Sequence, residues 1–160
     1  MAAVKIFVSF DIENDEVEKQ LFEGGMIQSC LTLKLLAWSA PSSIKPSRWQ
    51  AIVKDKINLC QLLIVLSGKH MATATNVSQE IAMARALSVP VFGVYISGAG
   101  RGDVLPEGLA LSRTIEREWS RIDEAIRLAL REGRNNPRPL ASVSRYQKAV
   151  SCQKNLGQKC

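Results

Sequence analysis

Glu80 is a single carboxylate in a stretch of apolar and small side chains, and its place in the chain makes it a candidate for chemistry. An apolar run at residues 62–66 and a polar loop at 67–76 precede it, and a second apolar run at 89–96 follows it. The two runs predict buried strands, so Glu80 is expected on the helix that joins them. Such a carboxylate either lies on a solvated helix face or belongs to a site, and its apolar neighbours favour a site.

Other residues that could take part in chemistry stand where predicted strands end. In an open parallel sheet the ligand crevice lies outside the carboxyl ends of the strands, so side chains at those ends are expected around it. Four of the five also have a structural interpretation: the two aromatic rings would cap the core, the histidine would lie on the surface, and the aspartate would cap a helix or turn. The strand-end candidates are Phe10, Asp11, Trp38, Ser39 and His70.

The elements that must position these residues alternate along the chain. Strand-like runs at residues 4–10, 31–37, 62–66 and 90–96 are separated by segments with apolar side chains at helical spacing, and a last helical stripe covers 119–130. The third run has no polar alternation, which is typical of a central parallel strand covered on both faces. The order predicts one three-layer α/β domain with a central parallel sheet and right-handed crossovers.

Charge divides the chain into two parts. Residues 1–132 carry 15 Lys and Arg against 15 Asp and Glu, whereas residues 133–160 carry six Lys and Arg and no acid. The sequence therefore predicts a folded domain at 1–132 and a basic, disordered C-terminal tail at 133–160. A nucleic-acid-binding domain needs its basic side chains on a folded face, so the balanced domain argues against nucleic acid as a partner.

The cysteines and the hydropathy exclude several other classes. The four cysteines (Cys30, Cys60, Cys152 and Cys160) show no close pair spaced like zinc ligands, and with a single histidine they predict neither a metal site nor a disulfide framework. No apolar run approaches about 18 residues, and the first strand-like run is too short for a signal peptide. We expect a soluble cytoplasmic protein without a membrane partner.

Two familiar classes of α/β domain do not fit the strand ends. A response-regulator receiver needs a phosphoacceptor aspartate after the central strand, but Ser67 and Gly68 stand there. A flavodoxin needs a phosphate-binding loop after the first strand, whereas residues 11–15 are acidic. The glycine-rich residues 98–102 open no clear helix, so they are weak as a dinucleotide-binding fingerprint.

Five segments carry a resemblance to known proteins: KIFVSFD (residues 5–11), AWS (37–39), LLIVLSGKH (62–70), EIAMA (80–84) and PVFGVYI (90–96). In this order they resemble bacterial TIR-like domains, and the likeness is closest to the TIR-like subunit of Thoeris anti-phage systems. The resemblance covers about residues 3–131. It implies a flavodoxin-like fold that binds NAD as a substrate and holds no permanent cofactor.

The resemblance also implies a reaction. In active members a glutamate on the helix after the central strand is essential for cleaving the bond between nicotinamide and ribose, and Glu80 matches it. A carboxylate near the ribose can stabilise the positive charge of an oxocarbenium-like transition state. Signalling members release an ADP-ribose-derived messenger that a neighbouring effector protein reads, and the chain is expected to form homo-oligomers on activation.

For the remaining strand-end residues the resemblance implies contacts with the nucleotide. Phe10 and Trp38 would offer apolar or stacking surface to nicotinamide or adenine. Asp11, Ser39 and His70 would bind ribose hydroxyls or phosphate oxygens. The alternative is a non-catalytic TIR-like module that works through protein contacts or nucleotide sensing, and such a module needs no carboxylate at position 80.

Overall fold

The computed structural model describes residues 3–39 and 46–132. The predicted tail at 133–160 lies outside the described residues. The strands are β1 (Val4–Ser9), β2 (Leu33–Trp38), β3 (Leu62–Ser67), β4 (Val91–Tyr95) and β5 (Thr114–Ile115). The helices are α1 (Glu16–Gly25), α2 (Pro46–Asn58), α3 (Thr75–Ala86) and α4 (Trp119–Glu132). Three short 3-10 helices complete the described elements: η1 (Met26–Gln28), η2 (Met71–Thr73) and η3 (Leu111–Arg113).

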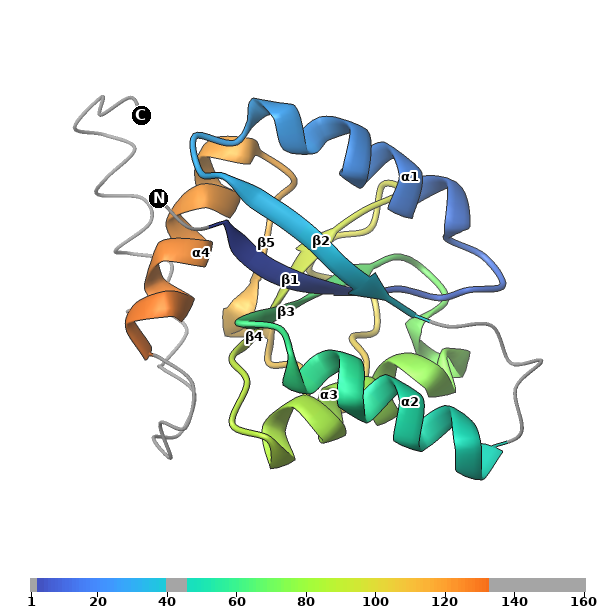
Figure 1. The fold of residues 1–160 in the computed structure, drawn as a ribbon. Coiled ribbons are helices and arrows are strands. Elements are labelled where there is room, and N and C mark those ends of the chain that lie inside the picture. The colour runs from blue at the N-terminus through green and yellow to red at the C-terminus, as the bar shows by residue number, and fades with distance from the viewer. Residues whose placement is uncertain (1–2, 40–45, 133–160) are drawn as a thin grey trace.

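The five strands form one parallel sheet in the order β2-β1-β3-β4-β5. The α1 and α4 helices cover one face of the sheet, and α2 and α3 cover the other (Figure 1). This arrangement confirms the predicted three-layer α/β domain of flavodoxin-like type. The chain leaves β1 toward β2 and then returns to β3 on the other side of β1. The switch in strand order therefore falls between β1 and β3, where open α/β sheets bind ligands.

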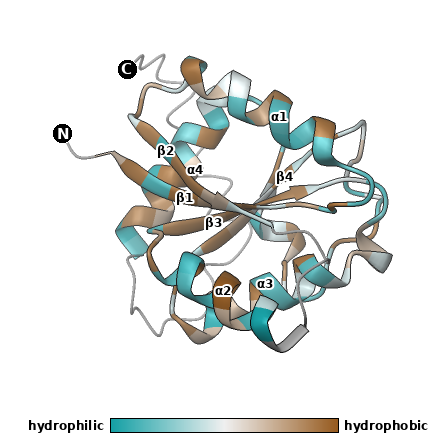
Figure 2. Ribbon diagram, turned by 45° about the vertical axis from the view of Figure 1, so that its right-hand side comes forward, coloured by the Kyte–Doolittle hydropathy of each residue, from teal (hydrophilic) through white to brown (hydrophobic). Residues whose placement is uncertain are grey.

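Two apolar clusters hold the layers together, one on each face of the sheet. The cluster under α2 and α3 includes Phe7, Val65 and Ile81, and the cluster under α1 and α4 includes Ile64, Phe92 and Ile126. The β3 strand supplies both clusters because its successive side chains point to opposite faces and all of them are buried. Figure 2 shows the resulting hydrophobic strands between helices that carry both hydrophilic and hydrophobic residues.

The β5 strand was not predicted, because two residues are too few to give a hydropathy pattern. Next to it lies a fully buried arginine, Arg113, which the sequence also did not single out. Its Nε donates to the Val91 carbonyl at 2.8 Å, and its Nη1 pairs with Glu132 Oε1 at 2.7 Å. A buried guanidinium is stable only with such partners, so Arg113 ties β4 to the end of α4.

Gly93 in β4 predicts a measurable packing effect. A methyl group at this position would lie 2.7 Å from Leu109 Cδ2 and 3.2 Å from two side-chain atoms of Thr114, all in the buried layer. We expect Gly93→Ala to lower the free energy of unfolding by about 1–3 kcal/mol, measured by urea denaturation. Gly102→Ala is the matched control because its methyl group would meet no atom within 4 Å. Equal stability of the two variants would contradict this packing.

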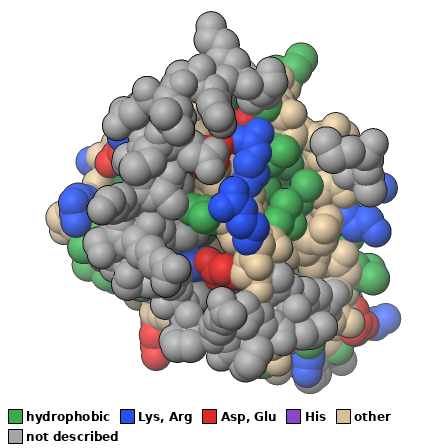
Figure 3. Space-filling view, turned by 90° about the vertical axis from the view of Figure 1, so that its left-hand side faces the viewer, with side chains coloured by type: hydrophobic (Ala, Val, Ile, Leu, Met, Phe, Trp, Pro, Cys, Tyr) green, Lys and Arg blue, Asp and Glu red, His purple; other side chains and the backbone are tan. Residues whose placement is uncertain are grey.

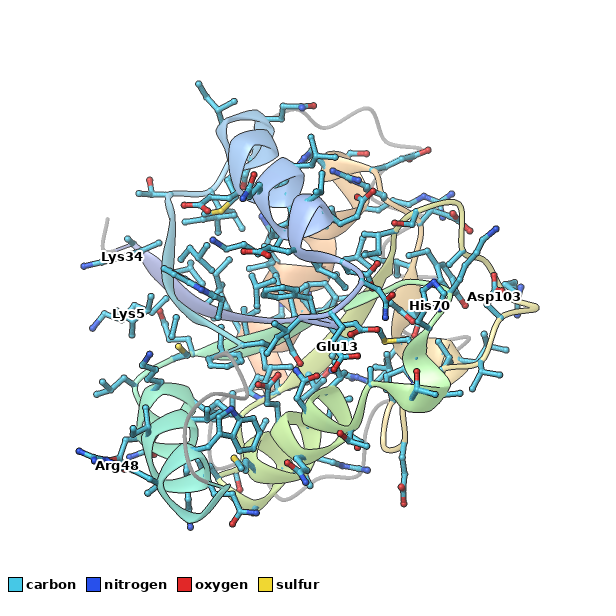
Figure 4. All side chains as sticks on the ribbon, turned by 90° about the vertical axis from the view of Figure 1, so that its right-hand side faces the viewer. Lys5, Glu13, Lys34, Arg48, His70 and Asp103 are labelled. Carbon is cyan, nitrogen blue, oxygen red and sulfur yellow. The ribbon has the colours of Figure 1, made fainter. Side chains whose placement is uncertain are left out.

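Figure 3 views the molecule from the side where the strands begin, and a group of Lys and Arg side chains is visible near the middle of that view. The exposed Lys5 and Lys34 are cross-strand neighbours in β1 and β2, and they lie far from His70 and Asp103 (Figure 4). Within residues 3–39 and 46–132, no helix has both the length and the apolar character needed to cross a membrane.

Candidate functional site

Glu80 lies in the middle of α3 and has no solvent-exposed surface. The interpretation of Glu80 as a solvated helix residue is therefore wrong. The helix turns this carboxyl toward the sheet, where it meets the ends of β1 and β2. The side chain thus lies close to the point at which the strand order switches.

The hydrogen-bond donors around this carboxyl all approach the same oxygen, Oε1. Ser9 Oγ donates to Glu80 Oε1 at 2.6 Å, and Ser39 Oγ donates to the same oxygen at 2.5 Å. Asn76 Nδ2 is 3.5 Å from Oε1, at the limit of a hydrogen bond. The second oxygen, Oε2, is buried and has no hydrogen-bond partner among the described residues. A buried polar atom without a partner is costly, so such an atom in a native fold needs an explanation.

The environment makes Glu80 a weak acid. Burial disfavours the charged form and raises the pKa of Glu80 from its ordinary value of 4.5 to about 7, while hydrogen bonds from Ser39, Ser9 and Asn76 act in the opposite direction. At neutral pH the carboxyl is therefore divided between its two protonation states. A carboxyl tuned in this way is suited to taking or giving a proton near pH 7.

The main chain at and just after the end of β1 holds the donors in place. Phe10 N donates to Ser39 Oγ at 3.0 Å, and Asn76 Nδ2 donates to the Phe10 carbonyl at 3.0 Å. Ser39 N donates to the Val8 carbonyl at 3.1 Å, which extends the pairing of β1 and β2. The carboxyl and its donors thus form one network that joins β1, β2 and the first turns of α3.

The two aromatic candidates lie on the other side of the sheet from Glu80. The Phe10 ring is buried in the cluster under α1 and α4, so this residue joins the network through its backbone only. Trp38 is 43% exposed, and its ring lies beneath Lys19 of α1, whose Nζ is 4.0 Å from the ring centroid. Nucleotide contacts by these rings remain predictions.

The Asp11 side chain caps its own turn. Its Oδ1 accepts from Glu13 N at 3.1 Å and its Oδ2 accepts from Asn14 Nδ2 at 2.7 Å. His70 is exposed on the loop after β3, at the same edge of the sheet as Glu13 and Asp103 (Figure 4). The structure therefore brings Ser39 into direct contact with Glu80 and leaves Asp11 and His70 on the loops nearby.

Sequence reasoning missed another buried acid near the ends of the strands, Asp15. Its carboxyl lies against Gly68, where an added methyl group would be 2.7 Å from Oδ2, and Oδ2 has no hydrogen-bond partner among the described residues. Burial, and then the charge of Asp11, raise the pKa of Asp15, while His70 lowers it. The carboxyl therefore lies where the loop after β1 comes close to the loop after β3.

Ser9 and Asn76 were also missed, although the sequence contains signals for both. Ser9 interrupts an apolar strand two residues after Phe7, so it lies on the face of β1 that α3 covers. Asn76 precedes Glu80 by four residues, which places both side chains on the same face of α3. Within the described ranges, no group of three or more His, Cys, Asp and Glu side chains is arranged to hold a metal ion.

Comparison with known families gives one match. A family model described as "Thoeris protein ThsB, TIR-like domain" matches residues 7–101, which is more than half of the chain. The matched residues include Ser9, Ser39 and Glu80, and they end before β5 and α4. No curated protein matches the sequence.

Proposed function

Because the chain belongs to the family of the TIR-like domain of the Thoeris protein ThsB, we propose that it is an NAD-processing enzyme of anti-phage defence. Family membership supports the defence role. The proposed activity is that of an NAD glycohydrolase or cyclase, which turns NAD into an ADP-ribose-derived messenger. A partner effector protein would bind this messenger, so the two proteins would be coupled through a diffusible nucleotide.

The observation that carries the catalytic proposal is the asymmetric environment of Glu80. Its Oε1 is held by two hydroxyl donors, whereas its buried Oε2 has no partner among the described residues. The carboxyl lies beside the switch in strand order, where this class of sheet binds ligands. This arrangement suits a carboxyl that acts on a bound molecule.

In the proposed reaction, the bond between C1′ of the ribose and the nicotinamide nitrogen breaks, and its electron pair leaves with nicotinamide. The nicotinamide of NAD is already cationic, so it departs as a neutral molecule and positive charge develops on the ribose. The Glu80 carboxylate stabilises that charge and accepts hydrogen bonds from ribose hydroxyls. Water then adds to C1′ and loses a proton, which yields ADP-ribose, or a nitrogen of the adenine adds there, which yields a cyclic product.

No part of the Glu80 side chain is exposed. In the proposed reaction the structure around Glu80 must therefore open before NAD reaches Oε2. The exposed residues Trp38 and His70 are able to meet a nucleotide before that movement. We propose that assembly into a homo-oligomer during infection opens the site, which would keep a toxic activity low in uninfected cells.

The same burial favours a second candidate function. In a non-catalytic TIR-like module, the Glu80 carboxyl and its hydrogen-bond partners would only join α3 to the sheet, and the protein would act through contacts or nucleotide sensing. A fully shielded carboxyl is compatible with that role. Oε2 argues against a purely structural role, because it has no hydrogen-bond partner among the described residues. A buried polar group kept only for structure normally has such a partner.

The test is the release of nicotinamide in infected cells. The full chain is co-expressed with the adjacent effector and challenged with phage, and lysates are assayed by mass spectrometry for nicotinamide and ADP-ribose derivatives. We expect both to rise after infection in cells that carry the chain. Protection without any such product would overturn the catalytic proposal in favour of the non-catalytic module.

A further inference from the structure

We propose that Ser9 and Ser39 are positioning residues that hold Oε1 of Glu80, so that Oε2 is the oxygen that faces the ribose of a bound nucleotide. This inference rests on the proposed function and specifies which oxygen of Glu80 takes part in the reaction. The two serines affect the reaction by orienting Glu80, without touching the substrate.

The hydrogen bonds around Ser39 fix the direction of its hydroxyl. The oxygen accepts a hydrogen bond from Phe10 N at 3.0 Å, so its single proton is available for Glu80 Oε1, which lies 2.5 Å away. A serine hydroxyl has one proton to donate, and here the carboxylate is its acceptor. Ser39 therefore acts as a directed donor and is not free to turn toward a ligand.

Ser9 supplies a second donor from a rigid element. It is the last residue of β1, paired with Val65 in the central β3 strand, and it is fully buried. The Ser9 hydroxyl on β1 lies 2.6 Å from Oε1, and the Ser39 hydroxyl approaches the same oxygen from the end of β2. Groups fixed on a sheet hold a catalytic side chain more accurately than groups on loops.

Because both serines donate to Oε1, only Oε2 of Glu80 is available to react with a ligand. Oε1 faces both serine hydroxyls and the more distant Asn76 amide, and a proton placed on Oε1 would lie against these donors. The proton of the neutral carboxyl therefore lies on Oε2, and the ionised carboxyl offers Oε2 to a ligand. The oxygen without a protein partner is thus the one that accepts from ribose and faces the developing charge.

Single Ser9→Ala and Ser39→Ala changes in the full chain test this assignment. The Glu80 carboxyl is followed by ¹³C NMR across a pH titration without NAD, and its signal is identified by its loss in Glu80→Gln. Hydrogen bonds from both serines favour the charged carboxylate. We therefore expect each change to make Glu80 about tenfold weaker as an acid. Ser39→Thr, which keeps the hydroxyl, should restore the wild-type titration.

Ser78→Ala is the matched control on α3, because Ser78 Oγ donates to the Thr75 carbonyl and not to Glu80. In the active protein, the pH at which nicotinamide release falls on the acid side should rise in Ser9→Ala and Ser39→Ala but not in this control. An unchanged Glu80 titration in both alanine variants would overturn the serine assignment, whatever their activity.

The two measurements separate the two possible failures. If the alanine changes weaken the acid but the wild type releases no nicotinamide in infected cells, the proposed function fails, and the reactive role of Oε2 fails with it. If nicotinamide is released and the Glu80 titration does not respond to either serine, only the positioning inference fails. A weakened acid together with a shifted pH profile supports both.

Discussion

Glu80→Gln is expected to lower the rate of nicotinamide release about 100-fold to 1,000-fold at saturating NAD and pH 8. The amide has nearly the size of the carboxyl, and its carbonyl oxygen can still accept from Ser9 and Ser39. It has no negative charge, so it does not stabilise positive charge on the ribose. The rate is measured by chromatography of nicotinamide, with protein isolated from infected cells in which the wild type is active.

The control for this variant is Glu107→Gln, which makes the same change at an exposed position outside the network. It should keep wild-type activity. Glu80→Asp is a second useful variant, because it keeps the charge but withdraws it from the two serines by one methylene group. Retention of more than about a tenth of the wild-type rate by Glu80→Gln would contradict the electrostatic role, which predicts a larger loss.

Much of the fold could be predicted because the strong signals in the sequence are local. The unbroken apolar run at residues 62–66 marks the central strand, and the helix that follows it carries Glu80 in the place expected. The family resemblance is confirmed over residues 7–101. In contrast, β5 is too short to give a pattern, and the buried Arg113 depends on partners 22 and 19 residues away in the chain.

The sequence analysis treated the strand-end residues as one group, although their side chains lie on both sides of the sheet. Successive side chains of a strand point to opposite faces, so Ser9 and Phe10 cannot both face α3. The structure places Ser9 beside Glu80 and the Phe10 ring in the opposite cluster. Trp38 and Ser39 separate in the same way at the end of β2. If the alternation of side chains along β1 and β2 had been extended to the ends of these strands, it would have predicted Ser9 and Ser39 as the neighbours of Glu80.

The buried carboxyl also predicts that wild-type stability, relative to Glu80→Gln, falls as pH rises. Folding raises the pKa of Glu80 from 4.5 to about 7, so the folded protein binds the proton more tightly than the unfolded chain. The stabilising contribution of the protonated carboxyl is thus complete below about pH 4.5 and is lost as pH rises through about 7. The loss amounts to about 3 kcal/mol. Glutamine does not titrate, so this loss is confined to the wild type.

Urea denaturation of both proteins at intervals from about pH 4.5 to 8.5 measures this difference. Other titrating groups, including the buried Asp15, are common to the two proteins and cancel in the comparison. Glu107→Gln, compared with the wild type in the same way, should show no comparable slope. A flat difference for Glu80→Gln would mean that the carboxyl titrates as if exposed, contrary to its burial. If the wild type instead loses stability relative to Glu80→Gln as pH rises, the protein is less stable at neutral pH because it keeps an ionisable group where an amide would fit. That is expected of a residue retained for chemistry.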